Sequence, residues 1–221
     1  MSSTALLSTT YFGPVQWYQK LYRHNHVLIE QHETFLKQTY RNRCLIATTQ
    51  GIQALTVPVI HSSDTEMVNV KLSDHGNWRH LHWQALVSAY GESPFFEFYA
   101  DDLRPFFEPR WKYLLDFNEA IREKMCELLD IHPHVELTTE YIHAIPDLRS
   151  PTRSLSPSTL NPAPSTDYRT SINPKHPGED PDFHPHRYYQ VYEQKHGFLP
   201  NLSILDLLIN MGPESIIVLS K

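Results

Sequence analysis

The first thirty residues read as a strand, a tight turn, a helix and a second strand, and this order constrains the fold more than any other feature. Residues 5–12 are small, β-branched and aromatic, and Gly13 and Pro14 then interrupt them. Residues 15–22 (VQWYQKLY) are typical of a short helix with proline at its start, and residues 27–30 (VLIE) of a strand. A strand–helix–strand unit pairs its strands in parallel through a right-handed crossover. The sequence therefore predicts an α/β fold.

The rest of the chain contains further strand-like and helix-like segments. Apolar alternation and β-branched runs predict strands over residues 44–48, 54–59, 68–72, 135–141, 188–192 and 216–219, the first two forming a hairpin. Helical spacing predicts helices that begin near residues 77, 93, 116 and 203, the third with Asp116 and Glu119 as a capping pair. A chain of 221 residues with 40% hydrophobic residues suits one core. We expect a single domain over residues 1–221, with a mixed or mostly parallel sheet flanked by helices.

One segment departs from this pattern. Nine of the 17 prolines lie between residues 146 and 187, mixed with Ser, Thr and Asn. This composition is typical of a long loop and not of a core segment. We expect residues 146–187 to form a proline-rich loop or extended arm, inserted before the C-terminal helix.

Charge and cysteine content exclude several classes of protein. A formal charge of -6, without a long run of either sign, gives no field that would collect nucleic acid. Cys44 and Cys126 are far apart and outside any C-x-x-C motif, so neither a disulfide framework nor a cysteine-based zinc site is expected. No run approaches the ~18 apolar residues of a membrane span, and residues 1–10 lack the features of a signal peptide. We expect a cytoplasmic protein.

Two polar stretches follow the predicted first and second strands. Gln16 and Trp17 come directly after the first turn, where helix N-terminal amides are a natural place for an anion; a purely structural connection is the alternative. Arg41, Asn42 and Arg43 offer forked donors for a carboxylate, a phosphate or a sugar, and a solvated basic turn is equally compatible.

Two helices carry polar side chains on otherwise apolar faces. His82 shares a face with Trp78, so it is either a hydrogen-bonded packing histidine or a general base. Ser203, Asp206 and Asn210 line one face of the last predicted helix. In one interpretation Asp206 and Asn210 face a cleft. In the other, Ser203 and Asp206 cap the helix and Asn210 meets solvent or a loop.

Histidines occur in four His-x-His pairs: His24/His26, His80/His82, His132/His134 and His184/His186. Residues two apart on a helix point to nearly opposite faces, and a zinc site needs three or four convergent ligands, of which no third is evident. The chain also lacks a G-x-G-x-x-G or Walker motif. We expect no metal and no cofactor.

Seven stretches, in this order and spacing, resemble the WbqC-like protein family of bacteria. They are YFGPVQWYQKL from Tyr11, FLKQTYRNRCLI from Phe35, LTVPV from Leu55, NWRHLHW from Asn77, AYGESPFFE from Ala89, LLDFNEAI from Leu114 and FLPNLSILDLLINMGP from Phe198, the last being the most specific. The chain departs from the family where the proline-rich segment replaces a helix that starts with Arg-Leu and a turn rich in Tyr and Gly.

Members of this family are similar to proteins encoded among O-antigen and other surface-polysaccharide genes, for which transfer of glycine or a related acyl group to an amino sugar has been suggested. The resemblance implies a transferase acting on a nucleotide-linked amino sugar. The matched positions assign His82 and Asp206 as catalytic residues, and they assign to substrate binding Gln16, Trp17, Arg41, Asn42, Arg43, Trp78 and Asn210.

Two alternatives remain open at this point. The chain is a non-catalytic interaction or scaffold protein of a polysaccharide assembly complex, which docks a partner through residues 146–187. Or it is a nucleotidyl- or adenylate-forming enzyme, which would bind ATP at the first turn.

Overall fold

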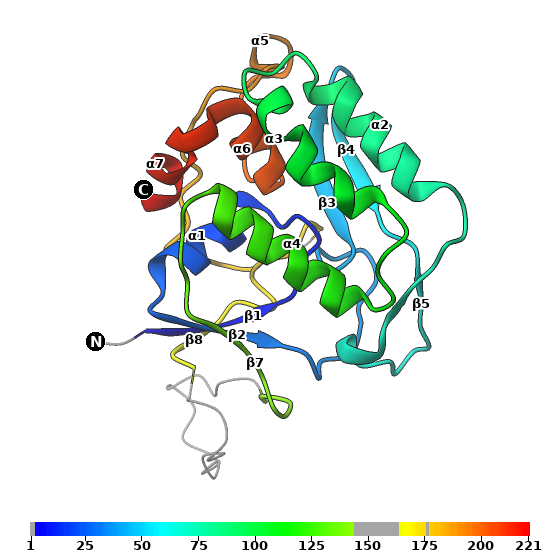
Figure 1. The fold of residues 1–221 in the computed structure, drawn as a ribbon. Helices are drawn as coiled ribbons and strands as arrows, with labels where there is room; N and C mark the ends of the chain where they lie inside the picture. The colour runs from blue at the N-terminus through cyan, green and yellow to red at the C-terminus, as the bar shows by residue number, and fades with distance from the viewer. Residues whose placement is uncertain (1–2, 144–163, 176) are drawn as a thin grey trace.

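The computed structural model describes residues 3–143, 164–175 and 177–221, and its centre is a four-stranded parallel sheet (Figure 1). The strand order is β7-β2-β1-β8, and all three pairings are parallel. The strands are β1 Thr4–Ser8, β2 His26–Glu30, β7 Val135–Leu137 and β8 Thr166–Asp167. Two antiparallel pairs lie outside it: β3 Arg43–Thr48 with β4 Gly51–Thr56, and β5 Val59–Ile60 with β6 Lys71–Leu72. The predicted α/β fold with a mostly parallel sheet is confirmed.

The predicted strand–helix–strand opening is also confirmed. β1 pairs in parallel with β2, placing Leu6 opposite Leu28, and α1 Val15–Arg23 connects them. β1 ends at Ser8, earlier than expected, and the chain then bends through Phe12, whose φ is 41°. A glycine follows because there is no room for a side chain: a Cβ on Gly13 would lie 2.4 Å from Thr10 Oγ1.

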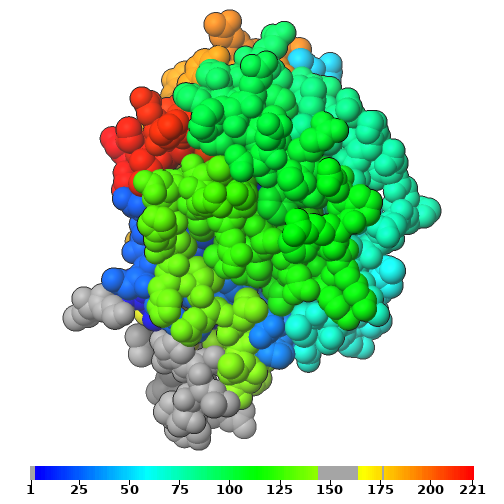
Figure 2. Space-filling view, in the orientation of Figure 1, coloured from blue at the N-terminus to red at the C-terminus, as the bar shows by residue number. Residues whose placement is uncertain are grey.

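The helices lie mainly on one face of this sheet, as Figure 1 shows. They are α2 Trp78–Tyr90, α3 Phe96–Leu103, α4 Leu114–Leu128, α5 Glu193–His196, α6 Ile204–Met211 and α7 Ser215–Ser220, with 3-10 turns at Met67–Asn69, Arg104–Phe107 and Gly212–Glu214. Residues of α2, α3 and α4 cover much of the face seen in Figure 2. No helix within the described ranges has the length and apolar character needed to cross a bilayer.

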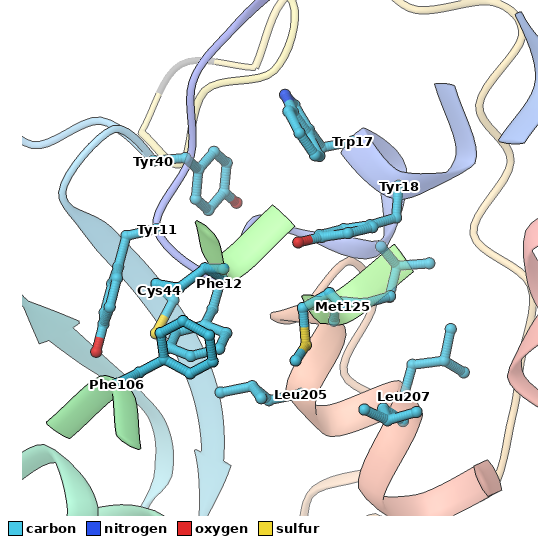
Figure 3. Packing of buried hydrophobic residues seen from close by; sticks show 14 of the residues in the cluster. Tyr11, Phe12, Trp17, Tyr18, Tyr40, Cys44, Phe106, Met125, Leu205 and Leu207 are labelled. Carbon is cyan, nitrogen blue, oxygen red and sulfur yellow. The ribbon is translucent and has the colours of Figure 1, made fainter. Parts of the chain in front are cut away.

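A single hydrophobic cluster joins the sheet to these helices. Figure 3 shows Tyr18 of α1, Met125 of α4 and Leu205 of α6 packed in one region, and each has at most 1% of its surface exposed. Ala5 and Leu7 of β1 belong to the same cluster. Burial of one side chain of this size contributes roughly 1.5–3 kcal/mol to stability. The cluster therefore holds the strands of the sheet in a fixed position relative to the helices.

Several element predictions were wrong. Residues 216–219 are helical within α7, because this apolar segment packs against α1 and α6 instead of joining the sheet. The structure places no strand at residues 188–192 and shortens the expected strands at 68–72 and 135–141. Asp116 and Glu119 do not cap α4, since that helix already begins at Leu114 with Tyr113 as its N-cap residue.

Residues 146–163 and residue 176 of the expected proline-rich arm lie outside the described ranges, and the rest of it packs on the folded domain. β8 lies in this segment and pairs with β1. Lys20 Nζ contacts both carboxylate oxygens of Asp180 at 2.8 and 2.9 Å, and the two side chains are only 1% and 3% exposed. This buried ion pair fastens the segment to α1.

We expect Asp180→Asn to destabilise the protein by about 3 kcal/mol, because it leaves the buried Lys20 ammonium without its carboxylate. Urea denaturation at pH 7 measures the loss. Asp182→Asn is the matched control, since Asp182 is exposed and Arg23 bonds only its backbone carbonyl. Equal stability of Asp180→Asn and the wild type would contradict a fastening role for the pair.

Candidate functional site

The carboxyl end of β1 is the topological switch point of the sheet. The chain passes from β1 to β2 on one side, and returns through β8 on the other side of β1. In open α/β sheets, ligands bind beyond the carboxyl ends of the strands where the connections diverge in this way. The geometry of the fold therefore selects the space beyond Ser8 and Asp167 as the first candidate site.

A small cavity, which we call the inner cavity, lies at this point. Its volume of about 10 Å³ is comparable to one water molecule. It is lined by Leu7, Ser8, Thr9, Thr10, Trp17, Tyr40, Arg41, Tyr168, Arg169 and Ile172. The buried hydroxyls of Thr9 and Thr10 have no hydrogen-bond partner within the described part of the chain, so both are available to a group placed there.

A larger and more open cavity, the outer hollow, adjoins the inner cavity. Its volume is about 430 Å³, which falls in the usual range of small-molecule sites. It is lined by His32, Glu33, Thr34, Leu36, Arg41, Tyr141, Asp167, Arg169 and Thr170. Arg41 and Arg169 line both spaces and form the boundary between them.

Arg41 is held in a bidentate pair with Glu33. Its Nε donates to Glu33 Oε1 at 2.8 Å and its Nη2 to Glu33 Oε2 at 2.5 Å. The same Nη2 donates to Ser8 Oγ at 2.8 Å, which connects the pair to the end of β1. Only 6% and 9% of the Arg41 and Glu33 side chains are exposed, so the pair is rigid and poorly screened by solvent.

Arg169 forms a second bidentate pair, with Asp167 at the end of β8. Its Nε and Nη2 lie 3.0 and 2.7 Å from the two carboxylate oxygens of Asp167. Its Nη1 lies 3.5 Å from Glu30 Oε2, and its guanidinium stacks over the ring of Tyr141. Glu30 is fully buried and also accepts hydrogen bonds from Thr138 Oγ1 and backbone amides.

The five charges of this cluster do not cancel. Two guanidiniums, Arg41 and Arg169, face three carboxylates, Glu30, Glu33 and Asp167, so with every group ionised the cluster carries one net negative charge. A buried excess of carboxylate favours a ligand that brings a positive charge, such as an amine. The two arginines can still hold an anionic part of the same ligand.

Among the residues expected from the sequence, Arg41 and Trp17 are brought together at the inner cavity. Trp17 Nε1 donates to Ser8 O at 2.9 Å, so the indole closes the space above β1. Gln16 instead contacts Asp180 and Asn201 through its side chain.

The first turn offers few free amides for a phosphate. Val15 N donates to Leu202 O, Gln16 N to Asn201 Oδ1 and Trp17 N to Pro14 O. An anion would have to displace protein acceptors to bind these three groups, although the helix N-terminus itself favours negative charge.

Asn42 and Arg43 point away from both spaces. The Asn42 amide donates to Val57 O, and its backbone carbonyl accepts from Val57 N, so it joins the ends of β3 and β4. Arg43 donates to Thr56 Oγ1 across the same hairpin. Neither residue lines the inner cavity or the outer hollow.

His82 and Trp78 lie in the hydrophobic core on α2. His82 is 6% exposed, its Nδ1 is 2.9 Å from Tyr11 Oη, and its ring packs on Trp78. Burial lowers the pKa of His82 to about 4, so it is neutral at physiological pH. Trp78 Nε1 donates to Ser73 O.

Asp206 and Asn210 are also enclosed. The fully buried Asp206 carboxylate accepts from Tyr90 Oη, Tyr188 Oη and Gln190 Nε2 at 2.8, 2.7 and 2.9 Å. Burial raises the pKa of this carboxyl, and the three hydrogen bonds oppose the rise. Asn210 Nδ2 donates to Asp206 O one turn back. The expected residues therefore occupy several separate places and not one cleft.

The sequence did not single out the residues that surround Arg41 at this site. Glu33 and Arg169 had no motif of their own, and Arg169 lay in the segment expected to be a loop. One signal was present: β2 is an apolar run that ends in the charged Glu30, at the carboxyl end of a strand, where α/β sites form. Glu33 lies only eight residues before Arg41, whereas Arg169 is brought to the site by the pairing of β8 with β1.

Comparison with known proteins identifies the family. The family model described as the WbqC-like protein family matches residues 9–218, which is most of the chain, and the protein belongs to this family. A relative is the uncharacterized protein Rv1507c of Mycobacterium tuberculosis (strain ATCC 25618 / H37Rv), 25% identical over 227 residues that cover 97% of this chain and 96% of that protein. No solved structure matched.

The lowered pKa of His82 predicts a loss of stability in acid. In the unfolded chain His82 takes up a proton near pH 6.5, whereas in the folded protein it does so near pH 4. The contribution of the neutral, buried His82 to the free energy of unfolding is therefore fully present above pH 6.5 and is lost as the pH falls. We expect about 2 kcal/mol less stability at pH 5 than at pH 7.5 from this residue. Denaturation of wild type and His82→Gln at both pH values measures the difference. His80→Ala, at an exposed position of α2, should retain the wild-type dependence.

Asp206→Ala should cost roughly 3 kcal/mol of stability, because two tyrosine hydroxyls and the Gln190 amide lose their buried acceptor. Asp206→Asn should cost less, since it keeps one acceptor oxygen and removes a buried charge. Thermal and chemical denaturation test both variants. Full stability of Asp206→Ala together with loss of ligand binding would instead support a role in a substrate site.

Proposed function

We propose that this member of the WbqC-like protein family is a transferase of bacterial surface polysaccharide (O-antigen or capsule) biosynthesis, which transfers glycine or another acyl group to a nucleotide-linked amino sugar in the cytoplasm. The observation that carries the proposal is the cluster of two arginines and three carboxylates at the switch point of the sheet. The free state of Cys44 and Cys126 is consistent with a reducing compartment.

The excess of carboxylate supports an amino sugar as the acceptor. Glu33 and Asp167 line the outer hollow, whose volume of about 430 Å³ accommodates a sugar ring. An ammonium group between these two carboxylates would neutralise the net charge of the cluster. His32 and Thr170 border the same hollow and offer hydrogen bonds to sugar hydroxyls.

The arginines support a nucleotide-linked form of that sugar. Arg41 and Arg169 present guanidiniums to both spaces, and guanidiniums pair well with phosphate oxygens. Each arginine is already oriented by a carboxylate, so it requires little reorganisation when the ligand arrives.

Glu33 is placed to act as the general base. In the proposed step the bound ammonium first loses one proton to solvent. The neutral amine nitrogen then attacks the acyl carbonyl carbon, the bond from that carbon to the donor's leaving group breaks, and Glu33 takes the second proton from nitrogen. Arg41, bonded to both oxygens of Glu33, stabilises the carboxylate before the step. A guanidinium is also available to the developing oxyanion.

The roles first assigned to His82 and Asp206 stay predictions. A histidine with a pKa of about 4 is a weak base near neutral pH, and the Asp206 carboxylate is enclosed by three donors. Neither residue lines the inner cavity or the outer hollow, whereas Glu33 lines the outer hollow, and this position favours Glu33 for proton transfer. The substrate-binding role of Gln16, Asn42, Arg43, Trp78 and Asn210 likewise stays a prediction.

The alternative, a scaffold protein that docks through residues 146–187, requires point variants for its test. Deletion of this segment would remove β8, Arg169 and the buried Asp180, and would therefore disturb fold and site together. Variants of Glu33 leave the segment intact, so they separate ligand binding from docking.

We expect Glu33→Gln to abolish stabilisation by a nucleotide-linked amino sugar and to slow amide formation by a factor on the order of 10²–10⁴, because it removes the charge and the base. Thermal shift with a panel of nucleotide-sugars, each with a free amine or with a hydroxyl in its place, measures binding. Mass spectrometry after addition of an activated acyl donor detects the amide.

Glu127→Gln is the matched control, since the Glu127 side chain is 66% exposed and pairs only with Lys124 on the surface. It should bind and react as the wild type does. The proposal is rejected if no nucleotide-sugar, nucleotide or acyl donor stabilises the wild-type protein, or if Glu33→Gln retains wild-type binding and rate.

A further inference from the structure

A second polar cluster lies at the other end of the parallel strands, where β2 and β7 begin. It contains His26, His134 and Glu136, whose ligand atoms all lie within 4.8 Å of one another. His26 begins β2, whereas His134 and Glu136 belong to the chain entering and forming β7. His26 and His134 come from two different His-x-His pairs, and Glu136 is a third candidate ligand outside both pairs.

The pairing of the two strands produces this cluster. In the parallel register Val27 lies opposite Val135, and Val27 N donates to His134 O at 2.8 Å. His26 and His134 precede these residues, so they lie side by side, with ring centroids 4.6 Å apart. Glu136 is two residues beyond His134, and side chains two apart in an extended chain point to the same face.

The distances suit a metal with nitrogen and oxygen ligands. His26 Nε2 is 3.3 Å from Glu136 Oε2, and His134 Nε2 is 3.4 Å from Glu136 Oε1. Two ligand atoms on a tetrahedral zinc, each about 2.0–2.1 Å from the ion, are about 3.3 Å apart. Both imidazoles already direct the same nitrogen toward one carboxylate.

The exposure of the three side chains allows an ion to enter. His26 is 11% exposed, whereas His134 and Glu136 are 66% and 51% exposed. One ligand is therefore fixed in the fold, and two lie at the surface, where they can adjust. Two imidazoles and a carboxylate are a frequent zinc ligand set, with a fourth position left for water.

We propose that His26, His134 and Glu136 form a zinc-binding site that joins β7 to β2. β7 has only three residues and lies at the edge of the sheet, so a metal bond to its neighbour would hold it in register. The site is at the other end of the strands from the outer hollow, and the inference does not depend on the proposed transferase activity.

The test uses untagged full-length protein, because a histidine tag would itself bind zinc. After EDTA treatment and dialysis, isothermal titration with zinc sulfate should show one ion per chain, and zinc should raise the melting temperature. Cobalt(II) should give the visible absorption of a four-coordinate site.

His134→Ala and Glu136→Gln remove exposed ligands, so both variants should fold. Each should weaken zinc affinity by at least about tenfold and abolish the zinc-dependent rise in melting temperature. His80→Ala, which removes an exposed histidine of another His-x-His pair, should bind as the wild type does. The inference is overturned if the wild type binds no zinc, or if His134→Ala and Glu136→Gln bind it with wild-type affinity.

Discussion

Parallel pairing on both edges of β1 is the constraint on which the rest of the structure depends. β2 occupies one edge along its whole length and β8 pairs with Ala5 and Leu6 on the other, so backbone groups on both edges of β1 have partners in the sheet. Alternate side chains, Ala5 and Leu7, then enter the hydrophobic cluster with the helices. Because the connections leave β1 in two directions, its carboxyl end opens onto a space that none of the described strands fills. Trp17 covers part of that space from α1.

Buried charge imposes a second constraint at the same place. Glu30, Arg41 and Arg169 are almost without exposure, and an unpaired charge in such a position costs several kcal/mol. Pairing with Glu33 and Asp167 offsets that cost. Stability alone does not explain the cluster, since apolar residues of similar volume often serve a core equally well or better. The position of these ions at the switch point is consistent with the proposed function, in which a ligand would bind them.

The two ends of one strand thus carry different chemistry. β2 begins with His26, which faces His134 and Glu136, and ends with Glu30, which faces Arg169 and accepts from Thr138. Both ends rely on the short strand β7 and the residues beside it. A contact that holds β7 to β2 therefore stabilises the strand pairing that also places Thr138 beside Glu30. The two clusters themselves lie at opposite ends of the strands.

The sequence by itself determined the features that local patterns encode. The strand–turn–helix–strand opening, the hairpin of β3 and β4, the helix that begins at Trp78 and the Ser203 cap of α6 follow from periodicity, turn residues and capping. The resemblance to the WbqC-like protein family also follows from the seven sequence stretches alone.

Only the tertiary structure decided what depends on contacts between distant segments. The two residues of β8 become a strand because β1 offers an unpaired edge, and residues 216–219 become a helix because α1 and α6 supply a surface for them. Arg41 could be singled out from the sequence, but its partner Glu33 and the neighbouring Arg169 could not. The same holds for His26 and His134, since their proximity is set by the register of two strands separated by more than a hundred residues. Local preference is weak compared with the free energy of burying a surface or pairing a buried charge, so long-range packing determined both clusters.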